Sequence, residues 1–451
     1  MSLIAKLENI MINGKFLWEK EQEDKFNLTD IYCRYEGAFN GDRNILNDKE
    51  NRIINGDNLN VMKCLAKEDM IEKFQFIYAD PPFFSKTDYK SEIKNKLNSD
   101  KTIPVLKQKA YKDSWENGME EYLTMLTARL YGFLELLKDD GIICMHLDWH
   151  AVHYIKVIMD EVFGEKNFVN EIIWNYKSGG VSKRRFARKH DTLLLYSKTK
   201  DYKFNPRREK SYNRGLKPYR FKGVKEYKDE IGWYTLVNMK DVWQLDMVGR
   251  TSAERTGYAT QKPETLLARL IDSCTDEGDL CGDFFGGSGT TAASCEKKGR
   301  RWISCDKGKL SSINTLKRMI QKGAKFQLYS TEKESIPYDP LDVDIDIKTG
   351  STDKNRIEIT LNSYSFPDDA QIPVEEKEMS LISEILNEDW VQLVDYFAVD
   401  FDYDGNYFCP HKISTRGHRN TSVTLTGMSD STGTIAVKVI DIFGNSSLRI
   451  Y

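Results

Sequence analysis

Apolar positions in the first 330 residues form short continuous runs that alternate with stretches of helical spacing. FQFIYAD at 74–80 and GIICMHLD at 141–148 have the continuous apolar character of buried strands. Residues 122–140 lie between them, repeat leucine at helical spacing and stop before Gly141, as a crossover helix does. This alternation predicts a mostly parallel, doubly wound α/β sheet.

A third region, LCGDFFGGSGTTAASCEKKGRRWISCDKGK at 280–309, predicts a strand, a glycine-rich turn, a helix and a second strand. Glycines let the backbone of such a turn approach a ligand, and the N–H groups at the start of the next helix point at it. The residues in these positions are Gly286, Gly287, Gly289, Thr290 and Thr291. Asp306 follows Asp283 by 23 residues, near the spacing of about 20 at which an acid meets ribose hydroxyls. An adenosine-containing cofactor is therefore predicted, with NAD and S-adenosylmethionine equally open.

The strand at 74–80 ends in an acid followed by two prolines. Pro81 and Pro82 cannot donate to a β-ladder and hold φ near about −65°, so the corner turns the Asp80 carboxylate and the Pro81 carbonyl outward together. An exocyclic amine of adenine or cytosine is a weak nucleophile because its lone pair is delocalised into the ring. Two acceptors that each take one N–H would localise that lone pair for attack on a methyl sulfonium. Hydride transfer has no use for such a corner, which therefore favours S-adenosylmethionine.

Two phenylalanines follow the prolines. Phe83 is expected to stack on the base, a contact worth about 1–3 kcal/mol, after the base has flipped out of the duplex. Phe84 is expected to form a wall of the same pocket. Two aromatic rings also suit the wider face of a purine, which gains more from stacking than a pyrimidine does.

DPPF at 80–83 and DFFGGSGTT at 283–291 together resemble the DNA amino-methyltransferases, specifically the circularly permuted β class in which the catalytic motif precedes the cofactor loop. The resemblance runs from about Asn51 to Lys309. It includes three further segments, namely INGDNLNVM at 54–62, NEIIWNYKSGG at 170–180 and YATQKPETLLARLI at 258–271. Phe284 is a departure, because the family usually has proline there. The implied fold is a Rossmann-like methyltransferase domain, with S-adenosylmethionine as the cofactor and duplex DNA as the substrate.

The resemblance also implies residue roles. The implied catalytic residues are Asp80, Pro81, Pro82 and Phe83, and the implied cofactor-binding residues are Asp57, Lys262, Asp283, Phe285, Gly287, Gly289, Thr290 and Asp306. An acid at position 80 resembles the adenine-modifying members, which predicts transfer to N6 of adenine in a restriction-modification or defence context. N4 of cytosine is the main alternative. A methyltransferase acting on RNA or a protein amide, and a non-catalytic DNA-binding protein, are further alternatives.

The net charge of −3 hides two regions of opposite sign. Residues 176–225 contain 17 Lys or Arg and three acidic residues, with eight aromatic residues between them, which favours phosphate binding. The predicted DNA-binding residues are Lys183, Arg184, Arg185, Arg188, Arg207 and Arg208. Residues from about 200 to 250 occupy the position of the family's target-recognition region. Residues 84–112, with eight lysines and three acids, are expected to form either a flap over the flipped base or an ordered lid.

Three parts of the chain are predicted: an N-terminal extension at 1–50, the methyltransferase domain at 51–330 and a β-rich domain at 331–451 with 22 acidic and 10 basic residues. Alternation on both sides of Gly444 and Asn445 predicts a terminal hairpin. No apolar run approaches the roughly 20 residues of a membrane span and no signal pattern begins the chain, so a cytoplasmic protein is expected. A homodimer and a restriction or defence partner protein stay open.

HLDWHAVH at 146–153 contains four residues of metal-ligand type: His146, Asp148, His150 and His153. The first is expected in a strand and the two later histidines in the following helix, with no standard zinc spacing, so no metal site is predicted. Asp148 is expected to line the active-site crevice instead. The eight cysteines contain no C-x-x-C pair and are expected to be reduced core residues for the most part.

Overall fold

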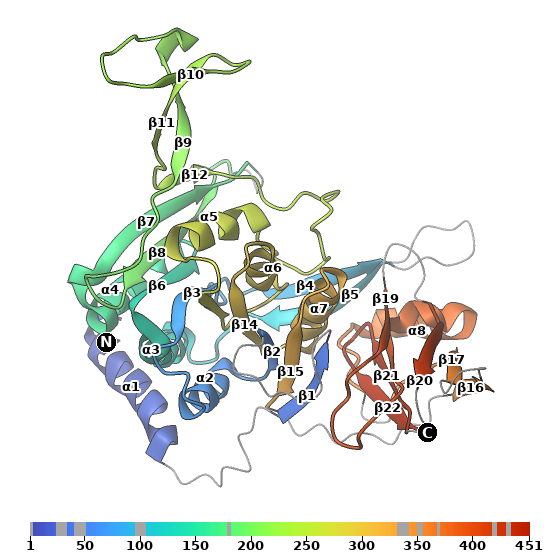
Figure 1. Ribbon diagram of the computed structural model, residues 1–451. Coiled ribbons are helices and arrows are strands. Elements are labelled where there is room, and N and C mark those ends of the chain that lie inside the picture. Colours follow the sequence, from blue (N-terminus) through green and yellow to red (C-terminus); the bar gives the residue numbers. More distant parts are fainter. Residues whose placement is uncertain are drawn as a thin grey trace.

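Helices cover both faces of one large sheet, and a smaller β-rich region lies beside it (Figure 1). The computed structural model describes residues 3–23, 34–39, 51–94, 105–177, 182–331, 342–349, 355–367, 370–416, 422–429 and 434–451. Across these ranges, no helix has the length and apolar content needed to cross a membrane. Seven of the eight cysteines fall within them, and all seven are buried and free, as predicted.

The central sheet has ten strands in the order β1-β15-β2-β14-β13-β3-β6-β8-β7-β12. In that order their bounds are Arg34–Phe39, Phe326–Ser330, Asn51–Asn55, Arg301–Asp306, Leu280–Asp283, Phe74–Ala79, Leu137–Leu147, His190–Ser197, Phe168–Asn175 and Val242–Gln244. The strands from β15 to β6 are parallel, whereas β8 is antiparallel to both β6 and β7. The predicted mostly parallel sheet is therefore confirmed.

Two helical layers bury the two faces of this sheet. One layer contains α1 (Leu7–Glu23), α2 (Asn58–Lys67), α3 (Gly118–Leu136) and α4 (Val152–Met159), and the other contains α5 (Glu264–Cys274), α6 (Thr290–Lys297) and α7 (Lys309–Gln321). Alternate residues of β3 point to the two layers, since Ile77 packs in the first cluster and Phe76 in the second. Helix α1, from the predicted N-terminal extension, buries Trp18 in the first layer.

The chain leaves β3 and β13 in opposite directions. From β3 it crosses through α3 to β6, and from β13 it crosses through α6 to β14, while β3 and β13 are themselves neighbours. Ligands of open α/β sheets bind outside the carboxyl ends of the strands at such a reversal of strand order. The loops after β3 and β13 therefore meet in one crevice, although their sequences lie about 200 residues apart.

Two antiparallel β-structures extend from the main sheet (Figure 1). Strands β4 (Asp88–Lys94) and β5 (Val105–Lys112) form a two-stranded ribbon shortly after the corner at residues 80–82. The predicted flap or lid coincides with this ribbon, and its connecting residues 95–104 lie outside the described residues. Residues 208–238, which we call the finger, project from the body and contain β9 (Arg208–Tyr212), β10 (Glu226–Lys228) and β11 (Trp233–Asn238).

The C-terminal region has two antiparallel sheets and one helix. The sheets have the orders β16-β17-β20 and β19-β18-β21-β22. The bounds are Asp342–Thr349 (β16), Asn355–Ser363 (β17), Glu376–Asp389 (α8), Val394–Asp400 (β18), Lys412–Thr415 (β19), Thr424–Ser429 (β20), Ala436–Asp441 (β21) and Ser446–Ile450 (β22). The antiparallel pairing of β21 with β22 confirms the predicted terminal hairpin.

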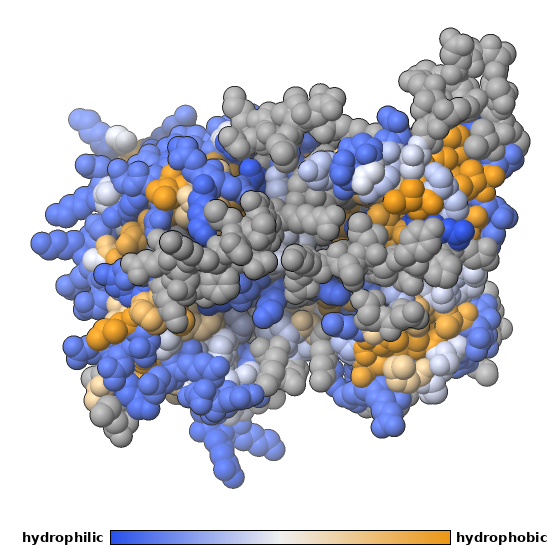
Figure 2. All heavy atoms as spheres, turned by 90° about the horizontal axis from the view of Figure 1, so that it is seen from below, coloured by the Kyte–Doolittle hydropathy of each residue, from blue (hydrophilic) through white to orange (hydrophobic). Residues whose placement is uncertain are grey.

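This C-terminal region packs on the body through both charged and apolar contacts. Lys317 in α7 pairs with Asp395 in β18 at 2.7 Å, and Leu106 of the ribbon belongs to the apolar cluster of the C-terminal sheets. Figure 2, which views the molecule from below, shows mostly hydrophilic side chains on the left and larger hydrophobic areas on the right, where the C-terminal region lies in Figure 1. The two parts of the molecule thus differ in surface as well as in sheet type.

Candidate active site

A cavity of about 630 Å³ lies at the point where β3 and β13 leave the sheet. Eleven of the predicted site residues line it: Asp57, Asp80, Pro81, Pro82, Phe83, Lys262, Asp283, Phe285, Gly287, Thr290 and Asp306. Gly289 lies next to them as the residue that precedes α6. The fold therefore brings the predicted catalytic and cofactor-binding residues together in one cavity.

The corner at residues 80–82 is held from two sides. Asp80 Oδ2 accepts a hydrogen bond from Lys262 Nζ at 2.5 Å, whereas Asp80 Oδ1 is buried and has no hydrogen-bond partner among the described residues. The Pro82 carbonyl accepts from Tyr122 OH at 2.7 Å. No described residue donates to the Pro81 carbonyl. The corner thus has two acceptors, Asp80 Oδ1 and the Pro81 carbonyl, that receive no hydrogen bond from the part of the chain that the structure describes.

The two phenylalanines of the corner point in different directions. Phe83 lines the cavity and packs against the His146 ring, with centroids 5.8 Å apart. Phe84 has a φ of 63° and packs on Tyr122 at 5.5 Å, against the apolar core. The prediction that Phe84 walls the pocket is therefore wrong, because the left-handed backbone at this residue turns its side chain away from the cavity.

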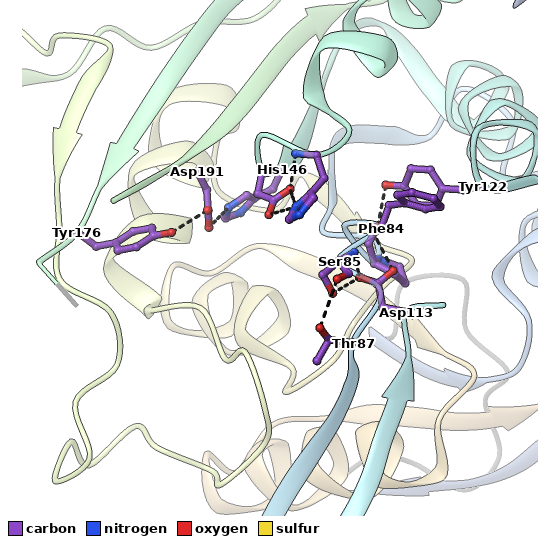
Figure 3. Close-up of polar contacts among 11 residues, drawn as sticks. Phe84, Ser85, Thr87, Asp113, Tyr122, His146, Tyr176 and Asp191 are labelled. Carbon is purple, nitrogen blue, oxygen red and sulfur yellow. Dashed lines mark hydrogen bonds and ion pairs between the residues drawn. The ribbon is translucent and has the colours of Figure 1, made fainter. Parts of the chain in front are cut away.

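Asp113, at the end of the ribbon, fixes the loop that carries the corner (Figure 3). Its fully buried carboxylate accepts from the Phe84 N–H at 2.9 Å, from the Ser85 N–H at 2.7 Å and from Ser85 Oγ at 2.7 Å. A carboxylate that accepts backbone N–H groups forms hydrogen bonds stronger than neutral ones. Asp113 thereby stabilises a backbone turn that non-glycine residues rarely adopt.

His146, Asp191 and Tyr176 form a polar network (Figure 3), and the His146 ring packs against Phe83. His146 Nδ1 contacts Tyr78 OH at 2.7 Å, His146 Nε2 contacts Asp191 Oδ2 at 3.2 Å, and Tyr176 OH donates to Asp191 Oδ1 at 2.9 Å. Burial opposes ionisation of Asp191, but hydrogen bonds from His146 and Tyr176 and the nearby positive charge of Lys262 outweigh it and lower the pKa of this carboxyl. The same burial raises the pKa of Tyr78, which stays a neutral hydroxyl. Both nitrogens of His146 are therefore engaged within the protein.

The other potential metal ligands of the HLDWHAVH segment, Asp148, His150 and His153, do not form one cluster with His146. His150 lies in a turn before α4 and not in a helix as predicted, because Asp148 caps this turn by accepting from the His150 N–H at 2.8 Å. Asp148 is absent from the described lining of the cavity, so its predicted place in the crevice is wrong. No group of three or more potential metal ligands occurs among the described residues.

The glycine loop closes the opposite side of the cavity. Gly287 has a φ of 51° and Gly289 a φ of 70°, and a Cβ at Gly289 would lie 2.7 Å from Thr315 Oγ1. Phe284, in the position where the family usually has proline, is fully buried and packs against Phe74 and Phe133. The loop is therefore anchored in the core by a large side chain, while its glycines approach the cavity.

Three acids surround this loop. Burial raises the pKa of Asp283 to about 7, although Thr291 Oγ1 donates to it at 2.5 Å and the Phe285 N–H at 3.0 Å. Burial also raises the pKa of Asp306, whose two oxygens accept from the N–H groups of Gly287 and Gly308, each at 2.8 Å. Asp57, the third acid, caps α2 through the Leu59 N–H.

Several lining residues were not found from the sequence. Arg129 in α3 lies 3.2 Å from both Asp57 oxygens, and Tyr89 and Tyr111 of the ribbon stack on each other at 4.8 Å at the cavity wall. Arg129 could have been found from the sequence, because it is a charged residue on the buried face of an otherwise apolar helix. The two tyrosines could not have been found in this way, since only the pairing of β4 with β5 brings them together.

The predicted DNA-binding residues fall in two places. Lys183, Arg184, Arg185 and Arg188 lie in the exposed loop between β7 and β8, at the same sheet edge as Asp80. Arg188 lies over the Trp149 ring at 3.3 Å. The Arg207 guanidinium already has a partner within the protein, because it donates to the Asp272 carbonyl. Arg208 is exposed at the start of the finger.

The finger uses its acids to hold its own turns. Asp229 accepts from Lys210 Nζ at 2.7 Å and from Tyr212 OH at 2.8 Å, and Glu226 accepts from the N–H groups of Tyr219 and Arg220. The basic residues toward its tip form no ion pair within the described part of the chain; they are Arg214, Lys217, Arg220, Lys222, Lys225 and Lys228. The finger therefore presents positive charge to its surroundings.

Comparison with known proteins supports this geometry. Residues 74–312 match the family model described as DNA methylase, which covers N6 and N4 methyltransferases. The chain is 28% identical over 276 residues to the type II methyltransferase M.HinfI of Haemophilus influenzae, covering 58% of this chain and 66% of that protein, slightly under two thirds. It is 26% identical to M2.LlaDCHI of Lactococcus lactis subsp. cremoris, covering 62% of this chain and 93% of that protein.

A shorter match is to the Mod subunit of the type III restriction-modification enzyme EcoP15I of Escherichia coli, 28% identical over 34% of this chain and 25% of that subunit. The family match extends from β3 through the corner at residues 80–82, the glycine loop and β14 into α7, and so contains most of the residues that line the cavity. Because this match covers more than half of the chain, the protein belongs to the DNA methylase family.

Proposed function

We propose that this protein transfers a methyl group from S-adenosylmethionine to the N6 amino group of an adenine flipped out of duplex DNA. The observation that carries the proposal is the pair of unused acceptors at the corner, Asp80 Oδ1 and the Pro81 carbonyl, in one cavity with the glycine loop. Two acceptors on adjacent residues match the two N–H bonds of an exocyclic amine.

The cavity suits S-adenosylmethionine in size and in donor chemistry. Its volume of about 630 Å³ falls in the range of about 300–1,000 Å³ usual for small-molecule sites. Asp306 would accept from ribose hydroxyls, Asp57 would contact the adenine end, and the Gly287 backbone leaves the space that a side chain would fill. When bound, the cofactor supplies an electrophilic methyl group, whose bond to sulfur breaks as its bond to nitrogen forms and leaves its electron pair on sulfur.

The residues of the corner prepare the target nitrogen. Asp80 Oδ1 accepts one N–H and the Pro81 carbonyl accepts the other, which draws the nitrogen toward tetrahedral geometry and directs its lone pair outward. Phe83 stacks on the base and is supported from behind by His146. The methylated nitrogen carries a positive charge, so one of its protons leaves, for which Asp80 is the acceptor in the cavity, and passes to water.

DNA contact is assigned to the loop at 182–189 and to the finger. The loop lies at the same sheet edge as Asp80, and the finger projects with its basic residues exposed. Arg184, Arg185 and Arg188 would contact phosphates near the flipped base, whereas the finger would contact the duplex further away. EcoP15I Mod is named as a subunit of a type III restriction-modification enzyme, which favours such a context for this protein.

Identification of the methylated nucleoside tests this proposal. Unmodified duplex DNA is incubated with purified protein and S-adenosylmethionine, digested to nucleosides and analysed by mass spectrometry. N6-methyladenine is expected. N4-methylcytosine alone would overturn the adenine assignment; this alternative stays open because the family covers both amines. Methyl label that enters RNA or protein in parallel reactions, and not DNA, would overturn the substrate class.

A further inference from the structure

Lys262 connects the two functional halves of the cavity. It precedes α5, far from the catalytic corner in sequence, yet its Nζ lies 2.5 Å from Asp80 Oδ2. Its side chain is only 10% exposed, and that of Asp80 18%, so water screens this ion pair weakly. Lys262 was predicted to contact the cofactor; its observed partner is the catalytic acid.

The two oxygens of Asp80 have different surroundings. Lys262 occupies Oδ2, while Oδ1 is buried and has no hydrogen-bond partner among the described residues. A buried acceptor without a partner costs free energy, so native proteins rarely retain one without a use for it. Here the use is the N–H of the target amine, which would occupy Oδ1.

An aspartate does not hold such an orientation by itself. The terminal torsion of an aspartate side chain is broad and roughly two-fold, so rotation would exchange the oxygens or tilt them away from the target. A charge-assisted hydrogen bond to one oxygen removes this freedom. The Pro82 and Tyr122 contact fixes the backbone of the corner but leaves this side-chain torsion free.

Lys262 is itself well anchored. Its carbonyl accepts from Thr290 Oγ1 at 3.1 Å, and Thr290 in turn accepts from Arg318 at 3.1 Å. Its ammonium group lies 5.1 Å from the centroid of the Phe83 ring, the ring proposed to stack on the base. The position of the Lys262 backbone is therefore set by the start of α6, which belongs to the glycine loop.

We infer that Lys262 is a positioning residue for methyl transfer, which locks the Asp80 carboxylate through Oδ2 so that Oδ1 receives the target amine. The inference rests on the proposed function. It assigns Lys262 to the geometry of the amine and not to cofactor affinity. Its effect therefore belongs in the rate of transfer at saturating cofactor and DNA.

The test compares the parent with Lys262→Met, Lys262→Arg and the matched control Lys297→Met, which removes an exposed lysine from the end of α6. Single-turnover transfer to duplex DNA is measured at saturating cofactor, cofactor affinity by calorimetry and folding by thermal melting. Displacement of a reacting group by about 1 Å costs about 100-fold in rate, which is the loss expected for Lys262→Met. Cofactor affinity should change less than about threefold, equivalent to about 0.7 kcal/mol, because the inferred role of Lys262 concerns the target amine and not the cofactor. Lys262→Arg retains the charge and should recover part of the rate.

A double-mutant cycle with Asp80→Asn separates positioning from general damage. If Lys262 acts through Asp80, then Lys262→Met should add little to the defect of Asp80→Asn. Additive losses, a parent-like rate for Lys262→Met, or a loss confined to cofactor affinity would each overturn the inference. Absence of transfer by the parent itself would instead overturn the proposed function, so the two failures are distinguishable. If Lys262→Met does not fold, Lys262→Arg in the same cycle decides the question.

Discussion

The charged side chains of the cavity and of the finger differ in burial and in their partners. Asp80 and Asp283 in the cavity, and Asp113 beside the corner, are buried or nearly so, and the chain supplies specific donors to each. In the finger, Asp229 and Glu226 hold turns together, and Lys210 pairs with Asp229, while the basic residues toward the tip remain exposed and form no ion pair among the described residues. The first arrangement fixes the positions of a few atoms, whereas the second provides charge without fixed geometry.

This difference has a physical consequence. A buried hydrogen bond is weakly screened, so the effect of removing it is large, local and insensitive to salt. An exposed charge is screened within about 8–10 Å at ordinary ionic strength, so its effect is small per residue and depends on salt. Substitutions in the cavity should therefore change the rate of transfer or cofactor affinity, and substitutions of the exposed basic residues should change the salt dependence of DNA binding.

The largest effect is expected at the corner. Asp80→Ala removes the carboxylate that would receive the amine, and the transfer rate should fall about 1,000-fold, as for the loss of other positioned acid-base or charge-stabilising groups. Cofactor affinity, measured by calorimetry, should remain close to that of the parent because the glycine loop and Asp306 are unchanged. Equal transfer rates in variant and parent would show that the corner does not act on the amine.

Gly287→Val should act on the cofactor instead. Valine at a φ of 51° is strained by about 1–3 kcal/mol, and its side chain enters the cavity. We expect at least about 100-fold weaker binding of S-adenosylmethionine, equivalent to about 2.7 kcal/mol. A normal dissociation constant would mean that the loop does not carry the cofactor.

Asp113→Ala tests whether the hydrogen bonds from Phe84 and Ser85 to Asp113 hold the corner in place. Loss of hydrogen bonds to the Phe84 and Ser85 N–H groups should release a strained turn and lower the transfer rate about 10- to 100-fold, or about 1.4–2.7 kcal/mol in activation free energy. Steady-state kinetics measures this effect, with the exposed Asp201→Ala as the control. An unchanged rate with a lowered melting temperature would make Asp113 a stabilising residue alone.

Reversal of Arg184, Arg185 and Arg188 to glutamate should alter salt dependence. If each contacts one phosphate, the slope of log affinity against log salt should flatten by about 2–3, at about 0.9 per contact. Titration of labelled duplex at several salt concentrations measures the slope. The same slope in variant and parent would assign these arginines to solvent.

The smallest effect concerns stability and pH. The Asp283 carboxyl ionises near pH 4 in the unfolded chain but has a pKa of about 7 when folded, so the free energy of unfolding falls as pH rises across this window. Asp283→Asn removes this contribution, and melting temperatures measured from pH 4 to 7 should fall less steeply than in the parent. Asp201→Asn, on the exposed surface, serves as the control and should keep the parent slope.

Much of the fold and of the site backbone could be predicted from short stretches of the sequence. The order of strands and helices, the stiff corner after β3 and the glycine loop before α6 all follow from periodicity, proline and glycine within a few residues. The prediction that two distant motifs share one crevice was also within reach, because it follows from the general behaviour of parallel sheets. The expected place of Phe84 was wrong because a positive φ cannot be read from an ordinary phenylalanine.

Tertiary structure alone decided which side chains serve the corner. Lys262 reaches Asp80 across 182 positions, Arg129 reaches Asp57 across 72, and Asp113 reaches Phe84 across 29. Periodicity places a residue on a face of its own helix or strand, but the partner on that face depends on how the elements pack. Sequence therefore determined the backbone of the site and its reactive groups, whereas the packing of distant elements determined which oxygen of Asp80 pairs with Lys262 and which has no hydrogen-bond partner among the described residues.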